Sequence, residues 1–473
     1  MAREQPGRPH HGKLEPQFEA LEPGDFAVDK DIAAPTPACA NKPAIVETPR
    51  LGAENIDEIV FLALLAGLAL APFSFVSNNS FGWRELAIFF AAFAVLYEIG
   101  LLISARRRPV AARRLWLPAL AFTLVCARML ARLDPAFSIG DREPILRMAL
   151  TMLGLDSHGL KPDEAILALL RLVACALAFW ISLQLCRSSA RARRLVEAIV
   201  IIEVLYACYG IVGFYIYSNA IFLFDKSLYR DSMTSAVIDR DAYAAYAGIG
   251  LTAAVALAMR LYITRHEFVT SSRSRKTAAL IAMTVGAGGA WFACAIVIAT
   301  GLCLTGSHSG FIATVAAIIA LALLLGIRGR PNAVAMGFGA LGAMLAIAGI
   351  FFNWSVAIFR RPSSNYWDET NRHFGDWSGA DNGYLELFQG LGGPFATIFI
   401  AGLGALAGRC FYAALTRRRS VIAPLAANAA TVIVWHHTFV DFSVQNSAVA
   451  LTWAALLGAA VAQSWSSGTA TEC

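Results

Sequence analysis

The chain has 473 residues, of which 57% are hydrophobic and only 15% are charged. Soluble globular proteins usually have about 25% charged residues, so this composition excludes an ordinary soluble domain and disorder over most of the length. It is typical of a polytopic helical membrane protein, in which each span needs about 20 apolar residues. The net charge of +6 is explained by loops that flank the spans, so we expect no nucleic-acid partner.

Residues 1–55 differ from the rest of the chain. They hold eight of the 18 prolines, carry charges of both signs and lack apolar periodicity. Such a segment cannot bury enough apolar surface to fold alone. We therefore expect a disordered cytoplasmic tail at 1–55, a transmembrane domain at 56–463 and a short cytoplasmic tail at 464–473.

From Ile56 onward, twelve apolar runs are each long enough to cross a bilayer as a helix. The runs lie at about 56–76, 83–104, 115–133, 165–186, 195–218, 241–263, 278–303, 310–327, 334–352, 383–408, 420–437 and 446–463. The predicted fold class is therefore an all-α polytopic membrane protein with about twelve transmembrane helices, attached to the bilayer as a multi-pass protein.

Arginine and lysine gather in alternate loops. These basic loops contain Arg106–Arg108, Arg187–Arg194, Arg265–Lys276, Arg328–Arg330 and Arg417–Arg419. The long loops of the other set, at about 134–164, 219–240 and 353–382, are rich in Asp and Glu. Because cytoplasmic loops carry the excess of Lys and Arg, we predict that both termini are cytoplasmic and that the three long loops lie outside.

The first candidate site lies where the loop 219–240 re-enters the membrane, at Asp239-Arg240-Asp241-Ala242-Tyr243-Ala244. An arginine at a helix start can hold an anion, because its guanidinium fork matches phosphate geometry, and Arg230 lies on the same loop. The alternative is an interfacial cation that extends to lipid headgroups. Asp239-x-Asp241 also imitates the metal-binding DxD of nucleotide-sugar enzymes. We set that interpretation aside, because no outer loop is long enough to form a nucleotide domain.

Two further segments combine polar groups near span ends. In the turn Leu304–Gly310, His308 is a candidate proton acceptor, although Ser and Thr there also suit an ordinary helix cap. The loop 353–382 contains Arg372 and His373 and leads into Asp381-Asn382-Gly383-Tyr384. This mixture suits a phosphorylated, sugar-bearing substrate, and it also suits any solvated loop.

A fourth segment, His436–Gln445, contains His437 and Asp441 four positions apart. On a helix these two residues share a face. With only two ligands visible, we predict that they orient a helix end by hydrogen bonds rather than hold a metal. The nine cysteines show no zinc-site or disulfide spacing either.

Taken together and in this order, the four segments resemble the O-antigen ligase and polymerase superfamily over about residues 195–463. The segments are Asp239–Ala244, Leu304–Gly310, Asp381–Glu386 with the later Gly390–Gly392, and His436–Gln445. Members of this superfamily are integral membrane glycosyltransferases that use undecaprenyl-diphosphate-linked glycans. His308 stands where the ligases have their second arginine, and Asp381 stands where they have their histidine.

The resemblance implies an enzyme of the bacterial inner (cytoplasmic) membrane in O-antigen or exopolysaccharide biosynthesis, without metal or other cofactor. It acts on the outer face, and the missing ligase residues favour a polymerase over a ligase. The acceptor is a second lipid-linked glycan for a polymerase and the lipid A core for a ligase. Envelope-glycan assembly proteins are candidate partners.

The resemblance also implies roles for particular residues. Arg240, with Arg230 or Arg372, would neutralise the lipid diphosphate, and Asn382 and Tyr384 would bind substrate. Asp381 is the positional candidate for the general base, followed by His308 and His373.

Two other classes of function remain open. Twelve spans with both ends inside are also a common layout of secondary transporters and flippases, which favour charges near the membrane midplane. A non-catalytic scaffold of an envelope-glycan assembly is the third hypothesis, suggested by the departures at His308 and Asp381.

Overall fold

Helices make up almost all of the part of the chain that the structure describes. The computed structural model describes residues 51–73, 80–105, 108, 110, 112–133, 162–216, 220–221, 224–225, 232–266, 287–328, 383–417, 421–441 and 443–465. Both predicted tails, apart from 51–55 and 464–465, and most of the three long loops lie outside these residues.

The elements occur in the following order in the chain. The long helices are α1 (Leu51–Leu70), α3 (Ser80–Ile103), α4 (Trp116–Leu133), α6 (Pro162–Leu185), α7 (Ser189–Ile216), α8 (Arg240–His266), α10 (Ala287–Leu304), α11 (His308–Ile327), α15 (Gly393–Thr416), α16 (Ile422–Val440) and α17 (Ser447–Ser464). The short elements are helix α14 (Gly383–Leu391), the 3-10 turns η2 (Ala112–Leu115) and η4 (Ser443–Gln445), and the antiparallel strands β1 (Ala220–Ile221) and β2 (Phe224–Asp225). The prediction of a helical fold is confirmed for the described residues, apart from this two-residue strand pair.

Eight of the described helices are long and apolar enough to cross a membrane, so the chain is a multi-pass membrane protein. The crossing segments are Gly82–Ile103, Arg113–Ala131, Ala165–Leu185, Ser189–Ile216, Arg240–Arg260, His308–Ile327, Gly393–Thr416 and Ser447–Ser464. The runs predicted at 56–76, 278–303 and 420–437 correspond to α1, α10 and α16, which are not among these eight helices. The run predicted at 334–352 lies outside the described residues, and the orientation in the membrane stays a prediction.

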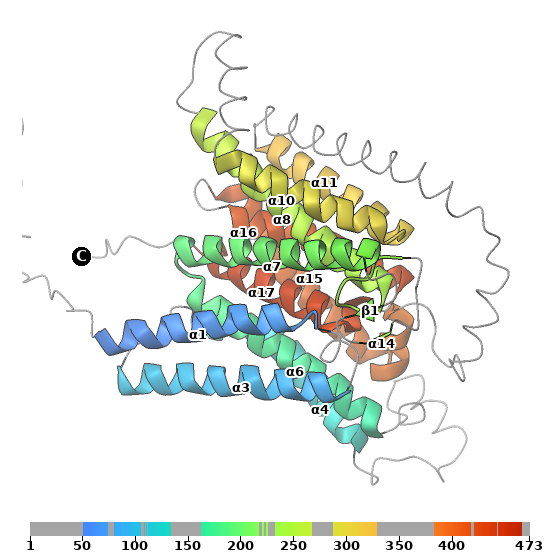
Figure 1. Cartoon of the computed structure of the whole chain (residues 1–473). Coiled ribbons are helices and arrows are strands. Elements are labelled where there is room, and N and C mark those ends of the chain that lie inside the picture. The colour runs from blue at the N-terminus through green and yellow to red at the C-terminus, as the bar shows by residue number, and fades with distance from the viewer. Residues whose placement is uncertain are drawn as a thin grey trace, which may run out of the picture. The chain divides into compact units, whose positions relative to one another are not determined.

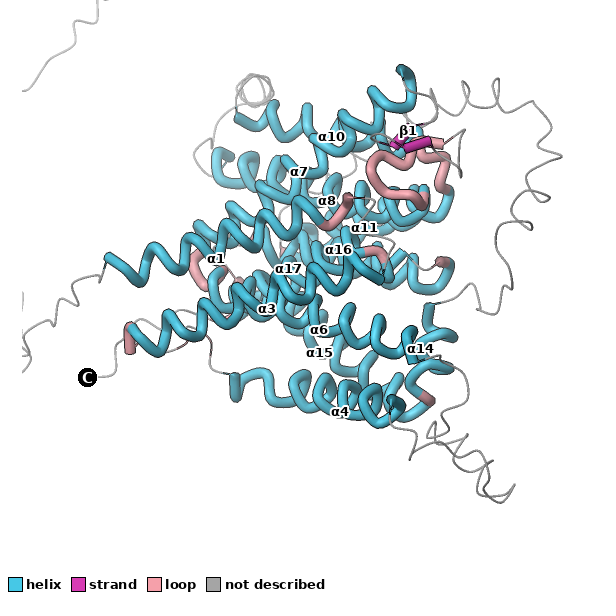
Figure 2. The backbone as a smooth tube through the Cα atoms, turned by 60° about the horizontal axis from the view of Figure 1, so that its bottom comes forward, coloured by secondary structure: helices cyan, strands magenta, loops and turns pink. Residues whose placement is uncertain are grey.

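The helices α8 and α17 lie inside the bundle. An 18-residue window within the crossing segment of each is entirely buried, whereas only 17% of the corresponding window of α4 is buried. Helix α8 is covered by α7, α10, α11 and α16, and α17 packs on α6, α15 and α16 (Figures 1 and 2). Small residues allow this close approach. A Cβ on Gly248 of α8, for example, would lie 2.4 Å from Oγ1 of Thr314 on α11.

At the end of the bundle where α6, α11, α15 and α17 end, arginine side chains form hydrogen bonds with the backbone of neighbouring helices. Arg187 donates hydrogen bonds to the carbonyls of Ala462 and Trp465, at 3.0 and 2.6 Å. Arg328 donates to the carbonyl of Arg417. These contacts satisfy carbonyl groups that helix C-termini leave without a partner within the helix. We call this end the arginine end.

At the opposite end, α8 and α11 begin while α10 and α16 finish. The backbone N–H of Met233, in the segment before α8, donates to the carbonyl of Leu304 at the end of α10, at 3.0 Å. Helix α14 also lies here, because a Cβ on Gly383 would be only 3.1 Å from Thr438 near the end of α16. We call this end the site end.

Candidate functional site

The first turn of α8 is held by the carboxylate that precedes it. Oδ1 of Asp239 accepts the backbone N–H of Asp241 at 3.0 Å, and Oδ2 accepts that of Ala242 at 3.3 Å. Asp is a favoured residue at this position, because its side chain satisfies N–H groups that have no partner within the helix. Helix α8 therefore begins at Arg240, with Asp239 and Asp241 on either side of it.

The start of α11 is built in the same way, by the turn that joins α10 to it. Gly306 has a φ of +67°, a backbone conformation that favours glycine. Ser307 follows as the N-cap, and its hydroxyl accepts the N–H of Gly310 at 3.0 Å. A Cβ on Gly310 would lie 2.4 Å from Cβ of Ala244, so the first turns of α8 and α11 are in close contact. The interpretation of this turn as a helix cap is confirmed.

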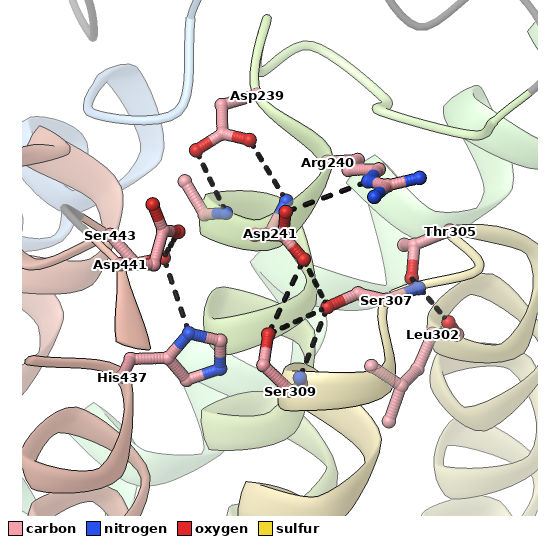
Figure 3. Close-up of polar contacts among 12 residues, drawn as sticks. Asp239, Arg240, Asp241, Leu302, Thr305, Ser307, Ser309, His437, Asp441 and Ser443 are labelled. Carbon is pink, nitrogen blue, oxygen red and sulfur yellow. Dashed lines mark hydrogen bonds and ion pairs between the residues drawn. The ribbon is translucent and has the colours of Figure 1, made fainter. Parts of the chain in front are cut away.

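Side chains of both helix starts meet at Asp241. The hydroxyl of Ser307 donates a hydrogen bond to Oδ1 of Asp241, and the hydroxyl of Ser309 lies 3.4 Å from the same oxygen (Figure 3). On the other side, Nε of Arg240 lies 3.5 Å from Oδ2 of Asp241. Asp241 thus connects the arginine to the α11 cap.

The end of α16 brings a histidine and a third carboxylate to the same place. The hydroxyl of Ser443 donates to Oδ2 of Asp441 at 2.6 Å and lies 3.3 Å from Nδ1 of His437. Figure 3 shows Nδ1 of His437 turned toward Ser443 and Asp441. The prediction that His437 and Asp441 serve a helix end by hydrogen bonding agrees with these contacts, which run through Ser443.

Three carboxylates are therefore crowded together at the site end. One oxygen from each of Asp239, Asp241 and Asp441 lies within 4.8 Å of the other two. Burial, and next the negative charge of Asp441, raises the pKa of Asp239 from 3.8 to about 7. The N–H groups of Asp241 and Ala242 act in the opposite direction by stabilising the charged form.

The segment that contains Tyr384 reaches this end as well. The ring of Tyr384 lies 4.4 Å, centroid to centroid, from the ring of Phe439 at an angle of 49°. Partial burial raises the pKa of the Tyr384 hydroxyl. The structure thus places α14 beside the end of α16.

The structure brings some of the predicted site residues together and leaves others apart. Arg240, His437 and Asp441 lie in the cluster, and Tyr384 packs beside it. His308 lies on the first turn of α11 but is exposed, and it has no place in the hydrogen-bond network of Figure 3. Five candidates lie outside the described residues: Arg230, Arg372, His373, Asp381 and Asn382.

Sequence reasoning missed the importance of the small polar residues and of the aspartates beside Arg240. Ser307 and Ser309 contact Asp241, Ser443 contacts Asp441, and the pair Asp239-x-Asp241 was set aside. The available signals were the position of Asp239 and Ser307 just before apolar runs, where caps are expected, and the Ser-x-Ser spacing of Ser307 and Ser309.

Comparisons with known proteins do not assign the chain to a family. The chain matches no protein-family model, and neither curated proteins nor solved structures give a significant match. The arguments about function that follow therefore depend on the residues and their geometry.

Proposed function

We propose that the chain is a membrane glycosyltransferase that transfers or polymerises undecaprenyl-diphosphate-linked glycan at the site end, with a polymerase favoured over a ligase. The observation that supports this most is the convergence of four segments that are far apart in the sequence. Parts of Asp239–Ala244, Leu304–Gly310, Asp381–Glu386 and His436–Gln445 all lie at the site end. The resemblance rests on these same segments, and residues that share one substrate must come together in space.

Arg240 is the residue that we assign to the lipid diphosphate. It is the first residue of α8, and 33% of its side chain is exposed. The N-terminus of a helix attracts anions through its N–H groups and its dipole, which adds to the charge of the arginine. A guanidinium can also form two parallel hydrogen bonds with a phosphate.

The proposed reaction exchanges one bond at the anomeric carbon for another. The acceptor hydroxyl attacks this carbon, the bond from the carbon to the diphosphate oxygen breaks, and the hydroxyl proton passes to a general base. Arg240 stabilises the charge that develops on the leaving lipid diphosphate. Asp381, His308 and His373 are the proposed candidates for the base, and of these only His308 is among the described residues, where it is exposed.

The distribution of arginines supports an outward-facing site. Arg187, Arg328 and Arg417 all lie at the arginine end, opposite the carboxylate cluster. Because Lys and Arg are retained on the cytoplasmic side, this polarity favours a cytoplasmic arginine end and an outer site end. We accordingly propose an inner-membrane location with both termini inside.

The first experiment is mass spectrometry of undecaprenyl-diphosphate-linked glycans in a strain that lacks the protein. Accumulated single repeat units would support a polymerase, and accumulated long chains with bare lipid A core would support a ligase. An unchanged pool would contradict both. Complementation with Arg240→Ala should fail, whereas Arg113→Ala, which changes an exposed arginine of η2, should restore the wild-type pool.

A transporter or flippase is the second candidate, and one observation favours it. Glu203, within the crossing segment of α7, is fully buried against α8, where a Cβ on Gly250 would lie 2.4 Å from Cγ of Glu203. Carboxyl groups inside a membrane often mark ion or proton pathways. Uptake of a lipid-linked glycan into proteoliposomes that is lost in Glu203→Gln, but kept in Arg240→Ala, would favour this alternative.

A further inference from the structure

Two of the arginines at the arginine end serve the last turn of α17. Arg187 donates hydrogen bonds to the carbonyls of Ala462 and Trp465. Arg417 donates to the backbone carbonyl and to the side-chain oxygen of Gln463. Because the C-terminal carbonyls of a helix have no partner within the helix and carry a partial negative charge, these two side chains act as helix caps.

Two further arginines reach the same place without capping a helix. Cζ of Arg114 on η2 lies 5.6 Å from the ring centroid of Trp465, and Cζ of Arg409 on α15 lies 5.3 Å from it. Nε of Arg409 also donates to the hydroxyl of Ser464 at 3.0 Å. Among the described residues, these two guanidinium groups donate no other hydrogen bond, although each has five N–H donors. Both therefore keep donors for a ligand.

Carboxylates do not balance the charge of this group. Within the described part of the chain, Arg114, Arg409 and Arg417 contact carbonyls, a hydroxyl, an amide and a ring, and none of the three pairs with a carboxylate. The three nearby helix ends, of α6, α15 and α17, each supply only about half a negative charge. Burial, and then the positive charges of Arg417 and Arg114, lower the pKa of Arg187, so these cations are close enough to repel one another.

Exposed aromatic side chains lie beside these arginines. Trp116, two residues after Arg114, is 65% exposed, and Tyr412 is 56% exposed, with its ring centroid 5.8 Å from Cζ of Arg409. Both aromatics belong to crossing segments, one near the start of that of α4 and the other near the end of that of α15, and these two helices pack on each other. Exposed Trp and Tyr at the ends of crossing helices mark the level of the lipid headgroups. The arginine group therefore lies beside a surface that faces lipid.

We propose that the arginine end binds an anionic phospholipid, with Arg114, Arg409 and Arg417 around its phosphate and its acyl chains along α4 and α15. A guanidinium matches a phosphate with two parallel hydrogen bonds. Basic pockets between transmembrane helices suit headgroups with more than one phosphate, of which cardiolipin is the example that we use as a probe. A free phosphate would meet the same arginines but has no chains to cover the exposed aromatics. The lipid site lies at the opposite end of the bundle from Arg240 and does not depend on the proposed function.

The test is native mass spectrometry of the purified full-length protein, delipidated in detergent and titrated with cardiolipin or with phosphatidylethanolamine. We expect the protein to retain one cardiolipin per chain and to bind phosphatidylethanolamine more weakly. Arg114→Gln and Arg409→Gln leave the helix caps in place and should each weaken cardiolipin binding about fivefold. The control Arg193→Gln removes the same charge from the first turns of α7, where Arg193 pairs with Glu197, and should bind cardiolipin as the wild type does.

A second measurement needs no variant. Photoactivatable cardiolipin, cross-linked to the wild-type protein and mapped by mass spectrometry of its peptides, should label residues 112–120 and 405–417. An excess of inorganic phosphate should leave the bound lipid in place, and displacement by phosphate would show a site for a soluble anion instead. Equal retention of the two lipids, an equal loss of binding in Arg193→Gln, or cross-links confined to other segments would each overturn the proposal.

Discussion

Ser307 donates a hydrogen bond to Asp241, and this contact joins the first turns of two helices that lie 66 positions apart in the sequence. The same hydroxyl accepts the N–H of Gly310, so one side chain both caps α11 and orients a carboxylate of α8. The capping residue of a structural helix is therefore also part of the candidate site, and its replacement should affect both.

Ser307→Ala should lower the free energy of unfolding by about 1 kcal/mol or more, because it removes the cap of α11 and a partner of Asp241. Thermal unfolding in detergent measures this effect. Ser309→Ala is the matched control, since Ser309 is not the cap and its bond to Asp241 is long, at 3.4 Å. Equal losses in the two variants would contradict the assigned role of Ser307.

The raised pKa of Asp239 predicts that the free energy of unfolding depends on pH. Burial, with Asp441 next, raises this pKa from 3.8 to about 7. Among the described residues, Arg240 and His437 are the basic groups drawn near it. Between about pH 4 and 7 the folded protein then binds more protons than the unfolded chain, so this carboxyl makes stability fall as pH rises.

Asp239→Asn removes the titrating group, so its unfolding temperature in EDTA should decrease less between pH 5 and 7 than that of the wild type. The Asn oxygen can still accept the N–H of Asp241, whereas the longer bond from the N–H of Ala242 to the second carboxylate oxygen is lost. Identical pH profiles for the two proteins would show that Asp239 titrates outside this range.

The contact between α6 and α17 should not tolerate a methyl group at Gly458. A Cβ there would lie 2.4 Å from the carbonyl oxygen of Phe179 and 3.0 Å from Cβ of Ser182. Gly458→Ala should therefore cost about 1–3 kcal/mol by overpacking. Gly404→Ala on α15 is the control, because nothing lies within 4 Å of its Cβ, and it should be neutral or stabilising. Denaturant unfolding of both variants distinguishes the two outcomes.

A buried hydrogen bond between α16 and α17 gives a further prediction. The indole N–H of Trp453 donates to Oγ1 of Thr431 at 3.0 Å. Thr431→Val preserves the shape but leaves a buried donor without its partner, which should cost about 1–3 kcal/mol. Thr431→Ser keeps the hydroxyl and should lose less. A larger loss in the Ser variant, measured by thermal unfolding, would refute the hydrogen bond as the cause.

The sequence by itself determined the class of fold. Runs of apolar residues long enough to cross a bilayer must form helices there, because lipid offers no partner to the backbone. In the structure, eight of the predicted runs form helices that are long and apolar enough to cross a membrane. The cap at the start of α11 was also predicted from the Ser and Thr residues before it, because capping is a local interaction.

Only the tertiary structure decided which polar residues share a site. His308 is close to Ser307 in sequence but exposed, whereas Asp441 is about 200 positions from Asp239 and adjacent to it in space. Helix packing determines such neighbours, and the sequence pattern of a helix that is apolar on all sides does not state which face meets which partner. For the same reason the burial of His437 beside Ser443 and Asp441 could not be foreseen from the sequence.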